Sequence, residues 1–147
     1  MNSPEDSVLQ VLEAYKAAVL GKDVDAFMRL YDQKVRVFDM WGMWSYEGAA
    51  AWRKMIETWF GSLGSELVKV SMDDVQATAG RELAMVSAIV TYAGVSAEGE
   101  ELRAMQNRLS WVLKPEGGAW KIVHEHTSAP VGFDDAKAML RREKATL

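Results

Sequence analysis

The strongest constraint on the fold is a change in hydrophobic period along the chain, from helical spacing before residue 65 to strand-like patterns after it. Four strand segments are expected, at 67–78, 82–94, 102–113 and 119–128, separated by short turns that contain glycine. Short connections join antiparallel neighbours, so these segments predict a β-meander. Helices followed by a meander predict the α+β class rather than a repeated βαβ unit.

The first part of the chain carries clear helix signals. Ser3 and Pro4 mark a helix start, and Gly21 marks its end. Between them one apolar face is formed by Val8, Leu12, Tyr15 and Val19. Asp23 is expected to cap a second helix. The alternating segment 35–41 then predicts a strand.

A third helix is expected after Gly48, and a short fourth one from Asp134. The third helix carries an unusually bulky apolar stripe, made of Trp52, Met55, Ile56, Trp59, Phe60 and Leu63. The short helix would be anchored by Met139 and Leu140. With no linker or repeat in its 147 residues, the chain is expected to form a single domain, 1–147.

Composition excludes several classes of function. The net charge of −4 argues against nucleic-acid binding, which needs a clustered positive field. Cysteine is absent, so neither a disulfide framework nor a thiol nucleophile is available. The acidic, polar start of the chain does not resemble a signal peptide, and no apolar run could span a bilayer. A cytoplasmic protein without membrane contact is expected.

The segment 83–93 predicts an interface. Both of its alternating sets are apolar or small, with Leu83, Met85 and Ile89 on one face and Ala84, Val86, Val90 and Tyr92 on the other. A strand that is apolar on both sides needs cover on both sides. Helices can cover one face, so we expect a homodimer through the other face of the sheet.

Polar side chains that alternation places on apolar faces are the best site candidates, because a buried polar group needs a partner. Such residues are Tyr15 on the first helix, Asp39 on the first strand, Asn107 on the third meander strand, and His124 with His126 on the last strand. Each alone could be structural. Together they converge on one interior, as in a pocket that binds a small molecule.

The two histidines allow a second interpretation. The sequence His124-Glu125-His126 would place both imidazoles on one face of a strand, a spacing that can chelate zinc. No third ligand is evident apart from Asp39, so neither a metal nor another cofactor is expected.

Three stretches resemble the nuclear-transport-factor-2-like superfamily, and within it the SnoaL-like and ketosteroid-isomerase-like branches. They are Tyr15 through Asp23, Phe38-Asp39-Met40-Trp41-Gly42 with the later Gly48, and the most specific, Trp120 through Ser128. The resemblance implies a cone-shaped, cystatin-like roll in which helices pack on a strongly curved mixed or antiparallel sheet. It also implies a pocket inside the cone and, usually, a dimer.

Against the isomerase branch, the resemblance implies that Tyr15 is an oxyanion donor and that Asp39 shuttles protons. Asn107 falls where those isomerases have a protonated aspartic acid, a departure that argues against steroid isomerisation. A general layout is left, in which a carboxylate base faces hydrogen-bond donors.

We therefore expect a small, mostly apolar organic ligand and, if the protein is an enzyme, proton-transfer chemistry such as isomerisation, cyclisation or dehydration. Asp39 would be the base, His124 or His126 the acid–base partner, and Tyr15 and Asn107 the donors. Apolar walls would come from Trp41, Trp52 and Trp59. Arg108 would face the pocket in place of Asn107 if a β-bulge exchanged the two faces of that strand. The alternatives are a non-catalytic sensor or assembly module and, more remotely, a metal-dependent lyase or hydrolase.

Overall fold

The computed structural model describes residues 3–142, so residues 1–2 and 143–147 of the expected domain lie outside the described residues. Three helices and six strands form in the order α1, α2, β1, β2, α3, β3, β4, β5, β6. The helices are α1 (Pro4–Leu20), α2 (Val24–Met28) and α3 (Ala49–Ser62). The strands are β1 (Tyr31–Phe38), β2 (Tyr46–Glu47), β3 (Leu67–Ala79), β4 (Ala84–Val95), β5 (Glu101–Glu116) and β6 (Ala119–Ser128).

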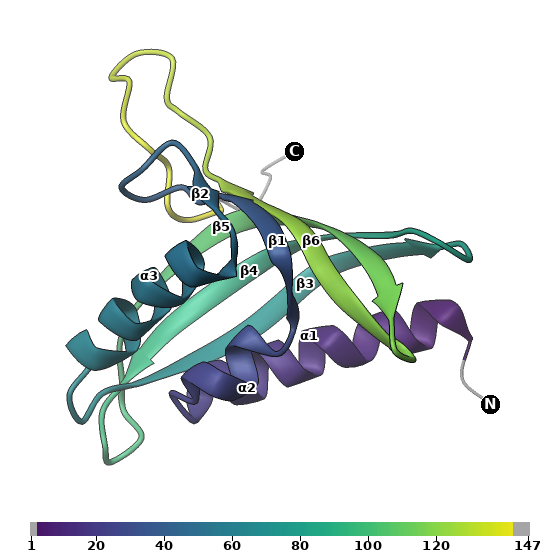
Figure 1. Ribbon diagram of the computed structural model, residues 1–147. Coiled ribbons are helices and arrows are strands. Elements are labelled where there is room, and N and C mark those ends of the chain that lie inside the picture. Colours follow the sequence, from purple (N-terminus) through teal and green to yellow (C-terminus); the bar gives the residue numbers. More distant parts are fainter. Residues whose placement is uncertain (1–2, 143–147) are drawn as a thin grey trace.

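All six strands form one curved sheet in the order β2-β1-β6-β5-β4-β3, with the helices packed on it (Figure 1). The strands β3 to β6 are antiparallel neighbours, which confirms the meander. The strand β1 pairs with β6 at the edge of the meander and runs parallel to it. The α+β class and the mixed, curved sheet are therefore confirmed.

The first helix forms where its terminal signals place it. The Ser3 side chain accepts from the backbone N–H of Asp6, and the Asp6 side chain accepts from the N–H of Ser3, so a capping box closes the N-terminus. Gly21 follows the last turn and donates to the carbonyl of Ala17. The helix then buries its apolar face against the sheet, through Val8, Val11, Leu12, Tyr15, Ala18 and Val19.

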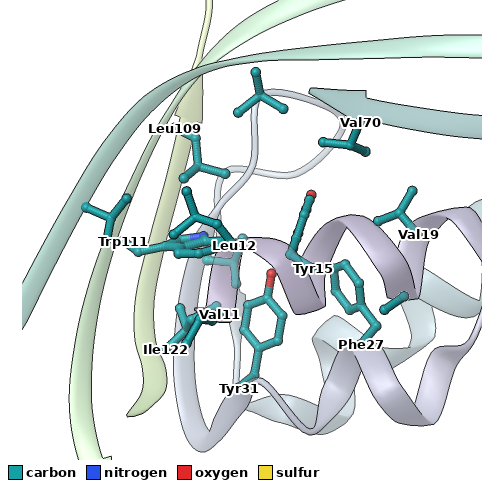
Figure 2. Packing of buried hydrophobic residues seen from close by; sticks show 14 of the residues in the cluster. Val11, Leu12, Tyr15, Val19, Phe27, Tyr31, Val70, Leu109, Trp111 and Ile122 are labelled. Carbon is teal, nitrogen blue, oxygen red and sulfur yellow. The ribbon is translucent and has the colours of Figure 1, made fainter. Parts of the chain in front are cut away.

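A cluster of aromatic rings fills the space between the helices and the sheet (Figure 2). Phe27 of α2 lies at its centre, with ring centroids 5.1 Å from Tyr15, 5.2 Å from Tyr31 and 5.7 Å from Phe60. Trp111 of β5 meets the ring of Tyr15 edge-on at 5.5 Å. These contacts join α1, α2, α3, β1 and β5 into one core. Three of its rings, those of Tyr15, Tyr31 and Trp111, bring a hydroxyl or N–H group into this core.

The segment after β6 is not helical, and the helix expected from Asp134 is wrong. Ala136 has a positive φ of 57°, and the Asp135 side chain accepts from the backbone N–H of Lys137, which makes a local turn instead of a helical one. An isolated β-bridge between Val131 and Ala138 closes this excursion. Its end returns to the sheet, where the carbonyl of Leu140 accepts from the N–H of Gln106 at 2.7 Å.

Among residues 3–142, none of the helices combines the length and the apolar composition needed to cross a bilayer.

Candidate functional site

A cavity of about 630 Å³ lies between the helices and the inner face of the sheet. Its walls are mostly apolar and include Trp41, Trp52, Met55, Ile56, Trp59 and Met105. Polar side chains in the cavity wall include those of Tyr15, Asp39, Tyr92, Asn107, Glu125 and Thr127. An apolar cavity with a few convergent polar groups is the ordinary form of a small-molecule site.

Asp39 lies just past the end of β1, and two donors hold its carboxyl group in place. The Thr127 hydroxyl donates to Oδ1 at 3.1 Å, and the backbone N–H of Trp41 donates to Oδ2 at 3.2 Å. Thr127 in turn accepts from the N–H of Met40 at 2.9 Å. Burial raises the pKa of Asp39, and the two hydrogen bonds oppose that rise. The result is an oriented carboxyl group with a more basic carboxylate than usual.

Glu125 brings a second carboxyl group to the same cavity, from β6. Its side chain is only 2% exposed. Tyr31 donates to Oε1 at 2.5 Å, and the indole N–H of Trp111 donates to the same oxygen at 2.8 Å. Burial raises the pKa of Glu125 to about 7, against the effect of these two bonds, and the nearby charge of Asp39 adds to the rise.

Two tyrosines form a third polar element of the cavity. The hydroxyl groups of Tyr15 and Tyr92 lie 2.9 Å apart, joining α1 to β4. Burial is the largest cause of the raised pKa of both phenols, so both are neutral at physiological pH. One hydroxyl donates to the other, which leaves one O–H hydrogen for a further acceptor.

Asn107 of β5 has an unused hydrogen-bonding atom beside the cavity. Its amide Nδ2 donates to the sulfur of Met40 at 3.5 Å. Its Oδ1 is buried and has no partner within the described residues. An unpaired buried acceptor is costly, so Oδ1 is the atom that a donor group of a ligand would satisfy.

Six of the predicted site residues line this cavity: Tyr15, Asp39, Trp41, Trp52, Trp59 and Asn107. The roles assigned to them stay predictions. Trp41 differs from its expected setting, since it lies in a bend after β1 and contributes its backbone N–H to Asp39.

The placement of His124, His126 and Arg108 in the cavity is wrong. A bulge causes the error for the histidines, because Val112 pairs with His124 while the adjacent Leu113 pairs with Ile122, which leaves Val123 as an extra residue. Side chains after the bulge therefore exchange faces. Ile122 still points into the core, and both histidines lie on the outer face of the sheet.

Outer-face contacts account for these three side chains. The Nδ1 atom of His124 lies 2.9 Å from the carbonyl oxygen of Arg36, and both imidazole rings meet Phe38 edge-on. Arg108 donates to the hydroxyl of Ser128 at 3.0 Å, on the face opposite Asn107. Within residues 3–142, no cluster of three or more histidine, cysteine, aspartate or glutamate side chains is arranged to hold a metal ion.

The same bulge brings Glu125 and Thr127 inward, and sequence reasoning missed both. Simple alternation places Glu125 and Thr127 on the face opposite Trp120 and Ile122. No residue type near Val123 indicates that a bulge occurs there. Tyr92 could have been found, because alternation places it with Val86 and Val90 on the face that α1 covers. Its phenol group in apolar company is the signal that singled out Tyr15.

The curved sheet, the packed helices and the internal cavity together define the nuclear-transport-factor-2-like class of folds. Residues 8–132 match the model of the SnoaL-like domain, so the chain belongs to the SnoaL-like domain family. A search among curated proteins finds no match.

Solved structures with similar folds cover nearly the whole chain. An NTF2-like protein of unknown function from Pseudomonas putida superposes with a TM-score of 0.83 at 21% identity, covering 95% of this chain and 96% of that one. Aln2 from a Streptomyces species gives 0.73 at 16% identity, covering 86% and 92%. The association domain of CaMKII from C. elegans gives 0.66 at 21% identity, covering 84% and 93%. At these identities the likeness concerns the fold alone.

Proposed function

We propose that this SnoaL-like protein binds a small, mostly apolar organic ligand in the cavity and moves a proton between two of the ligand's atoms, as an isomerase, cyclase or dehydratase does. The observation that carries the proposal is the Asp39 carboxyl group, oriented by Thr127 and by the N–H of Trp41 in the wall of an apolar cavity. A carboxylate with a raised pKa is a better base at neutral pH than an exposed one.

The cavity also supplies what such a reaction needs after the proton leaves. When Asp39 takes a proton from a carbon beside a carbonyl group, the electron pair of the C–H bond forms a C=C bond, and the π electron pair of the C=O bond moves to the carbonyl oxygen. The free O–H of the Tyr15 and Tyr92 pair can donate to that oxygen as its charge develops. Asp39 then returns the proton to another atom of the ligand, so no cofactor is consumed.

Replacing Asp39 with asparagine is expected to slow proton transfer by about a hundredfold or more, because the amide cannot accept the proton. The probe is 2-tetralone, a cyclic ketone fused to a benzene ring that has acidic C–H groups beside its carbonyl. The measurement is its rate of deuterium uptake in D₂O by proton NMR. The matched control is Asp73→Asn on the exposed part of β3, which is expected to keep the wild-type rate.

Three results would count against this proposal. Equal rates for the wild type and Asp39→Asn would remove Asp39 from the mechanism. Binding of 2-tetralone without any acceleration of uptake would favour the second candidate, a non-catalytic ligand-binding or assembly module. No binding at all would overturn both candidates for this class of ligand.

We also propose the expected homodimer through the outer face of the sheet. Met85 on that face is 53% exposed, and Ile89, four residues further along β4 on the same face, is half-buried. The wild type is expected to sediment at twice the 16.4 kDa chain mass. Ile89→Arg should shift it to the monomer by placing a charge in the interface, whereas Leu9→Arg on α1 should not. A wild-type monomer at tens of micromolar would contradict the dimer.

A further inference from the structure

Glu125 is the most deeply buried carboxyl group of the cavity, and no cation lies against it in the described part of the chain. The groups that face it are the phenols of Tyr31 on β1, Tyr15 on α1 and Tyr92 on β4, and the Asp39 carboxyl group. Arg103 also lines the cavity, but both of its terminal nitrogens donate to the carboxylate of Glu66, at 2.9 and 2.6 Å. The electrostatic surroundings of Glu125 therefore favour its neutral form.

The hydrogen bonds of Glu125 fall on one oxygen only. Both donors, Tyr31 and Trp111, reach Oε1. A carbonyl oxygen has two lone pairs, so Oε1 can accept both bonds in the neutral acid. Within residues 3–142 no donor reaches Oε2, and the side chain borders the cavity. The proton of the neutral acid therefore belongs on Oε2, which has no other partner.

We propose that Glu125 is held as a neutral carboxylic acid whose Oε2–H donates a hydrogen bond to a carbonyl or enolate oxygen of the ligand. The cavity then selects apolar molecules that carry such an oxygen, over hydrocarbons of the same shape. This inference rests on the proposed binding of a ligand in the cavity, and it assigns to Glu125 a role that neither histidine can fill from the outer face.

The two carboxyl groups then have opposite tasks. Asp39, with donors on both of its oxygens, takes the proton as the base, and Glu125 stabilises the negative oxygen that this step creates. Glu125 keeps its own proton throughout. The burial that raises the pKa of Glu125 to about 7 supports this division of roles.

The first test needs no ligand. In protein labelled with ¹³C at the glutamate carboxyl carbons, one resonance that disappears in Glu125→Gln should titrate with a midpoint near 7. Asp39→Asn should lower that midpoint, because the charge of Asp39 raises the pKa of Glu125. A midpoint in the range of ordinary glutamates, near 4.3, would overturn the neutral acid.

The second test measures binding of 2-tetralone and of tetralin, its hydrocarbon counterpart, through quenching of tryptophan fluorescence. Glu125→Leu should weaken 2-tetralone about tenfold and leave tetralin unchanged, since only the ketone can accept the bond. Glu125→Gln should stay within about threefold of the wild type, because its amide also donates. Wild-type affinity for 2-tetralone should fall as the pH rises through 7, and the affinity of Glu125→Gln should not.

The outcomes separate this inference from the proposed function. Equal 2-tetralone affinity in wild type and Glu125→Leu would overturn the role of Glu125 while leaving a binding cavity. If neither probe binds to the wild type, the binding function itself fails for this ligand class, and the NMR titration still decides the state of Glu125. If Glu125→Leu does not fold, the comparison of wild type with Glu125→Gln across pH carries the test.

Discussion

Replacing Glu125 with glutamine is expected to abolish a fall of about 3 kcal/mol in the free energy of unfolding, which the wild type should show as the pH rises from 4.5 to above 7. Between pH 4.5 and about 7 the native state holds a proton on Glu125 that the unfolded state has released. The free energy of unfolding therefore falls as the pH rises through this window. The stabilisation is fully present below pH 4.5 and is lost once the pH passes about 7.

Urea denaturation of both proteins at a series of pH values measures this effect. The difference between their free energies of unfolding should change across the window, because glutamine keeps the shape and the acceptor oxygen but does not titrate. Contributions from groups that do not interact with Glu125 are shared by both proteins and cancel. Glu98→Gln in the exposed turn before β5 is the control and should run parallel to the wild type. Parallel curves for Glu125→Gln would show that Glu125 is ionised in the native state.

Replacing Phe27 with alanine is expected to lower the free energy of unfolding by about 3–5 kcal/mol. Phe27 is fully buried, and its ring contacts those of Tyr15, Tyr31 and Phe60. The substitution removes apolar contact area and leaves a void that rigid aromatic neighbours cannot close.

The control for Phe27→Ala is Phe133→Ala, the same truncation at a fully exposed side chain. It should change stability by no more than about 0.5 kcal/mol. Urea denaturation at one pH compares the two variants with the wild type. A loss below about 1.5 kcal/mol for Phe27→Ala would mean that the helices repack over the void and that the aromatic cluster is not a rigid wall of the cavity.

Local signals were sufficient for most of the secondary structure. The capping box at Ser3 and Asp6, the side chain of Asp23 at the start of α2, and the glycine at position 48 before α3 all act within a few residues of themselves. Gly48 has a φ of 88°, which a glycine adopts without strain at the turn from β2 into α3. Such features depend on short stretches of chain, and the sequence alone therefore predicts them.

The segment after β6 shows where local signals misled. Asp134, with Met139 and Leu140 as apolar anchors, predicted a helix. Instead, the Asp135 side chain accepts from the backbone N–H of Lys137, and Ala136 takes a left-handed conformation. The bridge between Val131 and Ala138 replaces the helical bonds. The backbone hydrogen bond between Leu140 and Gln106 on β5 joins residues far apart in the sequence, so local helix propensity cannot predict it.

The sequence by itself determined the class of fold, its three main helices, the β-meander and several residues of the cavity wall, such as Tyr15 and Asp39. Only the tertiary structure decided which face of β6 meets the cavity. A strand's side chains alternate, so one extra residue at Val123 reverses everything that follows, and that residue is set by pairing with β5. For this reason the two histidines lie outside and Glu125 lies within.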